Sequence, residues 1–170
     1  MKKFALVFVA VSCVVAPLIL AAPDGIGHRS ASGWFDFEDC TFCRTLSKDP
    51  ALLAHTTWEN HPIRNGIMNI MTVDPAYAPA MAAAAQRRQE LSQQVQSGDL
   101  VGLSLNLCGH CQNFSELVKN GVEIQEVQGI AAVVSLYTSA DPALVKRLQA
   151  QAARDAEEMD LLRRSVHNQP

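Results

Sequence analysis

The chain has 170 residues, of which 48% are hydrophobic and 18% are charged, so it is long enough and apolar enough to bury a core. This composition excludes wholesale disorder and predicts one domain, or at most two small ones. The formal charge of −3 gives no electrostatic support for a nucleic-acid-binding surface, so we expect no nucleic-acid partner. The mean hydropathy of +0.04 is not that of a polytopic membrane protein.

Residues 1–22 have the features of a secretory signal peptide. Lys2-Lys3 precedes an uncharged apolar run, Phe4–Ala22, which ends in small residues. A retained membrane anchor is the alternative, because the run is marginally long enough to span a bilayer. We predict cleavage near Ala21 or Ala22, export to the periplasm or the extracellular space, and no membrane association afterwards. Loss of the two lysines would change the formal charge from −3 to −5.

Cys13 lies inside this apolar run. A lipoprotein cysteine is normally followed by polar residues, whereas the residues after Cys13 continue the apolar run. We therefore expect no lipid anchor. The mature chain would keep four cysteines, an even number, in a compartment where disulfides persist.

The mature chain is predicted to be a single α+β domain over residues 34–164. Residues 23–33 are rich in glycine, serine and other turn-forming residues, which predicts a flexible leader. Residues 165–170 are predicted to be a frayed tail.

Two β-hairpins are predicted from paired apolar runs. The turn Asn65-Gly66 separates residues 56–63 from 67–73, and Gln128-Gly129 separates residues 122–127 from 130–137. Asn-Gly between apolar runs is the strongest short-range hairpin signal.

Each predicted hairpin is followed by a helix that starts in the same way. Asp74-Pro75-Ala76 and Asp141-Pro142-Ala143 both place a capping acceptor before a proline at the first helical position. The first helix is expected to end at Ser97-Gly98-Asp99. The second carries one apolar stripe, formed by Leu144, Leu148, Ala152, Met159 and Leu162.

The order of these features indicates an internal αββα duplication, with pseudo-repeats at about 34–98 and 99–164. A C-x-x-C motif precedes each hairpin; Pro75 lies 35 positions after Cys40, and Pro142 lies 34 positions after Cys108. One hairpin alone is unstable, so we expect the two to pair. The predicted fold is a four-stranded antiparallel sheet with the long helices on one face, ferredoxin-like or related.

The two C-x-x-C motifs carry the functional prediction. Four thiolates form the tetrahedral sulfur set that Zn²⁺ prefers, and soft sulfur also suits Cu(I). The leading hypothesis is therefore an exported protein that binds Zn or Cu(I) in metal handling, sensing or structural stabilisation. The ligands would be Cys40, Cys43, Cys108 and Cys111.

The alternative is thiol-disulfide exchange or electron relay with a redox partner protein. The motif Cys108-Gly109-His110-Cys111, followed by a helix predicted over Gln112–Lys119, resembles the active-site tetrapeptide of the protein disulfide isomerase branch of thioredoxin-like proteins. The resemblance implies that Cys108 is the nucleophile and Cys111 the resolving thiol, with His110 tuning them. Leu107 stands where that family has tryptophan, so we do not predict its fold.

A third hypothesis is a disulfide-stapled binding protein. Closing one C-x-x-C would contribute about 2 kcal/mol, whereas a bridge between the motifs could contribute about 4 kcal/mol, so a structural role needs the bridge between motifs.

Two histidines and a covalently bound haem are the remaining possibilities for the site. His55 and His61 are weaker candidates for metal ligands. Covalent haem attachment needs C-x-x-C-H, but Arg44 and Gln112 follow the second cysteines, so we expect no haem.

Overall fold

A computed structural model describes residues 29–97 and 105–167. The predicted signal peptide and Cys13 lie outside the described residues. Within the described ranges, none of the helices is both long and apolar enough to cross a membrane.

The chain order of the elements is a short helical segment, a hairpin and a long helix, followed by a helix, a second hairpin and a longer helix. The helical elements are α1 (Arg44–Ser47), α2 (Pro50–Ala54), the 3₁₀ turn η1 (Pro75–Tyr77), α3 (Ala78–Ser97), α4 (Gly109–Lys119) and α5 (Pro142–His167). The strands are β1 (Thr56–Ile63), β2 (Gly66–Val73), β3 (Glu123–Gln128) and β4 (Ala132–Thr138).

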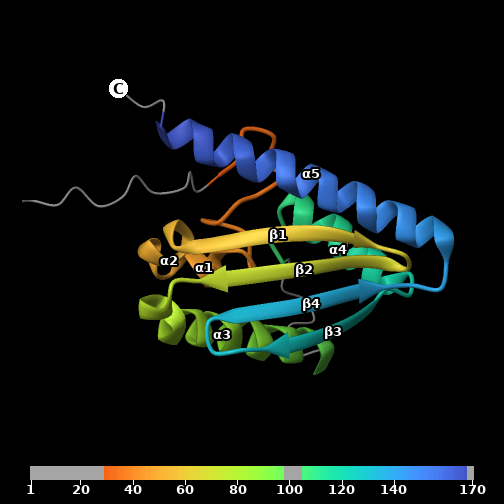
Figure 1. Cartoon of the computed structure of the whole chain (residues 1–170), viewed down its shortest axis with the longest axis horizontal. Helices are drawn as coiled ribbons and strands as arrows, with labels where there is room; N and C mark the ends of the chain where they lie inside the picture. Colours follow the sequence, from red (N-terminus) through yellow and green to blue (C-terminus); the bar gives the residue numbers. More distant parts are fainter. Residues whose placement is uncertain (1–28, 98–104, 168–170) are drawn as a thin grey trace, which may run out of the picture.

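Both predicted hairpins are present, and they form one antiparallel sheet in the order β1-β2-β4-β3 (Figure 1). Gly66 is required where the two hairpins meet, because a Cβ there would lie 1.9 Å from the carbonyl oxygen of Tyr137. The fold is therefore α+β, with a four-stranded antiparallel sheet and helices packed against it.

One face of the sheet carries the core. Alternation along β2 places Ile67 and Met71 on the same face, and Met71 lies opposite Val133. Met71 and Val133 pack with Met81 of α3, whereas Ile67 packs with side chains of α4 and α5. The long helices thus cover the same face, and the stripe predicted for α5 is buried.

The two helix starts predicted at Asp-Pro differ in the structure. Asp141 caps α5, because its Oδ1 accepts from the backbone N–H of Ala143 at 2.8 Å. Asp74 makes no side-chain cap, so the prediction of a capped start for the first helix is wrong. Its carboxylate instead bonds Nδ1 of His55 at 2.7 Å, and Pro75–Tyr77 forms a 3₁₀ turn before α3 begins.

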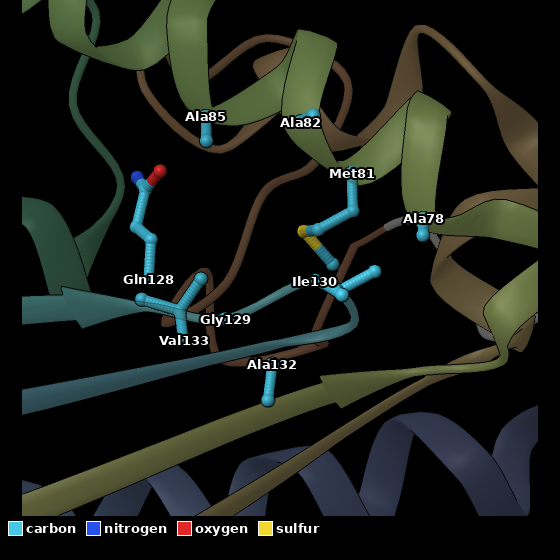
Figure 2. A pocket seen from close by; sticks show the side chains of 9 residues that line it. All are labelled: Ala78, Met81, Ala82, Ala85, Gln128, Gly129, Ile130, Ala132 and Val133. Carbon is cyan, nitrogen blue, oxygen red and sulfur yellow. The ribbon is translucent and has the colours of Figure 1, made fainter.

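Helix α3 also covers the turn between β3 and β4 (Figure 2). A shallow hollow lies between the alanines of α3 and the turn, with Ile130 at its rim. Its lining contains no charged residue, and Gln128 supplies its one polar side chain.

Two boundaries differ from the sequence predictions. Within residues 29–33 of the predicted leader, Ser30 is buried and Arg29 pairs with Asp36, whereas the other residues are exposed. At the other end, α5 continues to His167, so part of the predicted frayed tail is helical. The first of these segments contacts the start of α4, because the N–H of Gly109 donates to the carbonyl of Gly33 at 3.1 Å.

Candidate metal centre

The four cysteines of the two motifs meet at one place in the fold. Cys43 precedes α1, and Cys108 precedes α4, 65 positions later. The Sγ of Cys43 lies 3.6 Å from the Sγ of Cys108 and 3.6 Å from that of Cys111. With Cys40 included, all four Sγ atoms lie within 4.8 Å of one another.

These distances fit one tetrahedral ion. Metal–sulfur bonds of about 2.3 Å set the sulfurs of a tetrahedral site about 3.8 Å apart. The same sulfurs are too far apart to be bonded to each other, and all four are free cysteines. The cluster can therefore hold a metal ion such as Zn²⁺.

The electrostatics of the cluster favour a cation. Hydrogen bonding with Cys108 lowers the pKa of Cys40, and hydrogen bonding with Cys111 lowers the pKa of Cys108 to about 6. Hydrogen bonding with Cys108 raises the pKa of both Cys43 and Cys111. Without a cation the four sulfurs share protons, because four adjacent thiolates repel one another; a bound divalent ion would remove this repulsion.

The cluster lies in an apolar environment. Cys40, Cys43 and Cys108 are buried, and only Cys111 is partly exposed. Around them pack aromatic side chains of the N-terminal segment and two residues of α5: Trp34, Phe35, Phe37, Met159 and Leu162. The apolar shell limits water access and strengthens the attraction between thiolates and a cation.

Backbone hydrogen bonds hold the two motifs together. The N–H groups of Gly109 and His110, at the start of α4, donate to the carbonyl oxygens of Gly33 (3.1 Å) and Trp34 (2.9 Å). Thr41, inside the first motif, donates its N–H to the carbonyl of Asn106 at 2.7 Å. The segment 29–39 therefore joins the two cysteine pairs.

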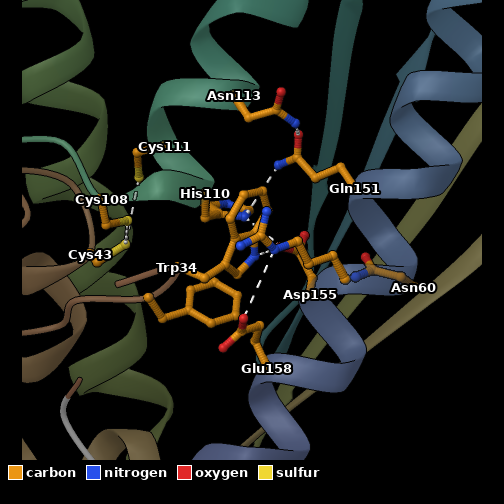
Figure 3. Close-up of polar contacts among 12 residues, drawn as sticks. Trp34, Cys43, Asn60, Cys108, His110, Cys111, Asn113, Gln151, Asp155 and Glu158 are labelled. Carbon is orange, nitrogen blue, oxygen red and sulfur yellow. Dashed lines mark hydrogen bonds and ion pairs between the residues drawn. The ribbon is translucent and has the colours of Figure 1, made fainter. Parts of the chain in front are cut away.

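A buried polar network connects this segment to α5 (Figure 3). Asp155 of α5 accepts from the indole N–H of Trp34 at 2.7 Å and lies 2.8 Å from Nδ1 of His110. Burial alone would lower the pKa of His110, but the hydrogen bond and charge interaction with Asp155 raise it overall. Arg154 lies over the Trp34 ring, 3.8 Å from its centroid.

Gly109 gives a direct test of the packing beside the centre. A Cβ there would lie 2.9 Å from Cε3 of Trp34 and 3.4 Å from its Cα. We expect Gly109→Ala to lower the free energy of unfolding by about 1–3 kcal/mol, because Trp34 must shift within a packed cluster. Denaturant unfolding measures the change. Val118→Ala, on an exposed position of α4, is the control; equal losses in the two variants would contradict this role of Gly109.

The other predicted site residues have different surroundings. His110 does lie beside the cluster, but its imidazole is bonded to Asp155. His55 stacks on Tyr77 and bonds Asp74, and His61 bonds Glu59 at 3.1 Å. Neither belongs to the four-residue metal-ligating group found among the described residues.

Sequence reasoning missed Asp155 and Gln151, whose Nε2 lies 3.2 Å from Nδ1 of His110. A signal for Asp155 was present. It lies between Ala152 and Met159 on the apolar stripe of α5, and a carboxylate on a buried stripe needs a hydrogen-bonding partner.

The fold and site together define an α+β protein with a buried four-cysteine cluster that can hold a metal ion. No protein-family model matches the chain, and no curated protein and no solved structure matches it significantly.

Proposed function

We propose that this chain binds one soft or borderline metal ion, Zn²⁺ or Cu(I), through Cys40, Cys43, Cys108 and Cys111. The observation that carries the proposal is the convergence of four Sγ atoms within 4.8 Å, from two motifs far apart in the sequence. A short C-x-x-C pair forms locally in many folds, whereas two pairs meet only if the tertiary structure brings them together.

Zn²⁺ is the better fit of the two ions. Four sulfurs at tetrahedral spacing satisfy its usual coordination completely, and a closed set of four protein ligands is typical of structural rather than catalytic zinc. The role we propose is therefore structural stabilisation: the ion joins α1, α4 and the segment 29–39. Metal handling or sensing would require exchange of the ion through the partly exposed side at Cys111.

We further propose that the centre arose with an internal αββα duplication, in a fold related to the ferredoxin-like class. The sheet order β1-β2-β4-β3 supports a duplication. The two hairpins lie side by side in it and pair through their second strands, β2 and β4, as two equivalent halves would. Each half also supplies one C-x-x-C motif. The halves differ in detail, since α1 has four residues and α4 has eleven.

Export by residues 1–22 remains part of the proposal, with function in the periplasm or the extracellular space. In that setting a bound ion would protect the four thiolates from oxidation to disulfides.

A redox function is the second candidate, and one observation favours it. Cys108 directly precedes α4, the position of the attacking thiol in many disulfide-exchange proteins, and hydrogen bonding with Cys111 lowers its pKa to about 6. Its burial counts against attack on a protein disulfide, because exchange needs access to the sulfur.

The experiment is a titration of the reduced, metal-free protein with Co²⁺ and then with Zn²⁺ or Cu(I). We expect the ligand-field absorption of tetrahedral cobalt thiolate, saturating at about one ion per chain, and displacement by zinc. Cys43→Ser should weaken zinc binding by about 100-fold or more. His61→Ala is the matched control and should leave binding unchanged. A protein that binds no ion and cycles between dithiol and disulfide would instead support the redox function.

A further inference from the structure

The two edge strands of the sheet, β1 and β3, differ in how far they are protected from pairing with a further strand. Strand β1 contains Pro62, which has no N–H to offer, and helix α5 packs against both β1 and β2 (Figure 1). At the end of β1, the carbonyl of Ile63 already accepts from Gln149 at 3.1 Å. Pro62 therefore makes the β1 edge a poorer partner for another strand.

Within residues 29–97 and 105–167, strand β3 has none of these protections. All six of its residues are exposed, and it contains no proline and no lysine. Large apolar side chains gather on this strand and its turn: Ile124, Val127, which is 68% exposed, and Ile130, which is 95% exposed. Ile124 and Val127 point to opposite faces of the sheet, and Ile130 lies in the turn, so exposed apolar side chains border the β3 edge on both faces.

The β3–β4 register shows which N–H and C=O groups of β3 do not bond to β4. The N–H of Gly129 donates to the carbonyl of Ala132 at 2.7 Å, and the β3–β4 register continues from this pair. Because bonded and non-bonded pairs alternate in an antiparallel ladder, the odd-numbered residues of β3 bond to β4. Ile124, Glu126 and Gln128 therefore direct their N–H and C=O groups away from β4, toward the open edge.

The sequence of β3 is complementary to itself in one antiparallel register. With Val127 opposite Val127 of a second copy, Glu126 of each strand lies opposite Gln128 of the other. This register matches the outward N–H and C=O groups, and it places no like charges opposite each other. A shift that centres the pair on Glu126 would place two carboxylates face to face, which is destabilising.

We infer that the free edge of β3 binds a second copy of this chain. The two strands pair antiparallel about a twofold axis at Val127, so that two four-stranded sheets form one sheet of eight strands. The contact is small, because a six-residue edge buries less surface than a standard interface, and we expect a dissociation constant of about 1–100 µM.

The test is sedimentation velocity of the metal-loaded protein over a concentration series. The subunit mass of the full chain is 18.5 kDa, and we expect a reversible increase to twice this value. Val127→Lys places two ammonium groups opposite each other at the axis and should weaken association by about tenfold or more. Leu161→Lys is the matched control, because Leu161 is 54% exposed on α5, away from β3.

A mixture tests the register itself. Val127→Lys and Val127→Glu should each be mostly monomeric alone, whereas their equimolar mixture should form a heterodimer through the opposite charges at the axis. A single monomeric species up to about 500 µM would overturn the inference, as would a dimer that Val127→Lys does not weaken. Failure of the mixture to associate would overturn the register. Metal content is measured in the same samples; a monomer that keeps its metal would contradict only the dimer.

Discussion

Removal of the metal ion is expected to lower the free energy of unfolding by about 5 kcal/mol or more, because binding of a structural ion by four cysteines is itself folding free energy. The ion would join α1 to α4 inside the cluster that contains Trp34 and Leu162. Without it, the partly ionised sulfurs remain in an apolar environment. Denaturant unfolding of zinc-loaded and chelator-treated protein measures the difference, and the fluorescence of Trp34 and Trp58, which both contact the cluster, reports whether it opens.

A buried residue outside the centre provides the control for this effect. Leu52 is fully buried beneath α3 in a different cluster, so Leu52→Ala should lower stability by about 2–5 kcal/mol with zinc and without it. Cys43→Ser, in contrast, should remove the dependence of stability on free zinc. Equal unfolding curves for the zinc-loaded and chelator-treated wild type would mean that the ion contributes nothing to the fold.

Loss of the Asp155 carboxylate is expected to have the second largest effect. Its Oδ1 accepts from the indole of Trp34 and bonds the imidazole of His110, and the residue is 8% exposed. Asp155→Ala would leave the buried indole N–H of Trp34 without an acceptor and the partly buried His110 without its carboxylate partner, which should lower the free energy of unfolding by about 2–5 kcal/mol. Asp155→Asn keeps an acceptor oxygen in place, and it should lose less. Denaturant unfolding followed by near-ultraviolet circular dichroism measures both.

Asp160→Ala on the same helix is the matched control. The side chain of Asp160 is exposed and pairs with Arg163 at 3.5 Å, so its loss should change stability by no more than about 0.5 kcal/mol. If Asp155→Ala unfolded at the same denaturant concentration as Asp160→Ala, the polar network would have no structural role.

Local signals in the sequence predicted the elements of this fold well. The strands on either side of Asn65-Gly66 match their predicted limits to within one residue, but the two turn residues are Arg64 and Asn65, because Gly66 already pairs with Ile63. The second hairpin, which lacks the Asn-Gly turn, has a fourth strand that begins at Ala132 rather than at residue 130. Helix α4 begins at Gly109, three residues before the predicted start, because the C-x-x-C motif itself forms its first turn.

Contacts between distant segments were harder to predict. The sequence identified the four cysteines, but their meeting depends on the segment 29–39, which was predicted in part as a flexible leader. The capping role expected for Asp74 failed because its carboxylate has a competing partner in His55, a contact that no local pattern reveals. Asp155 was detectable only as a charge out of place on an apolar stripe.

The most direct test of the four-cysteine centre is X-ray absorption at the metal edge, on protein purified with its native ion. The account predicts about one ion per chain with four sulfur ligands at about 2.3 Å, and four thiols that react only after the ion is removed. Purified protein that contains no metal and has its cysteines in disulfides would contradict it, as would an ion bound mainly by nitrogen or oxygen.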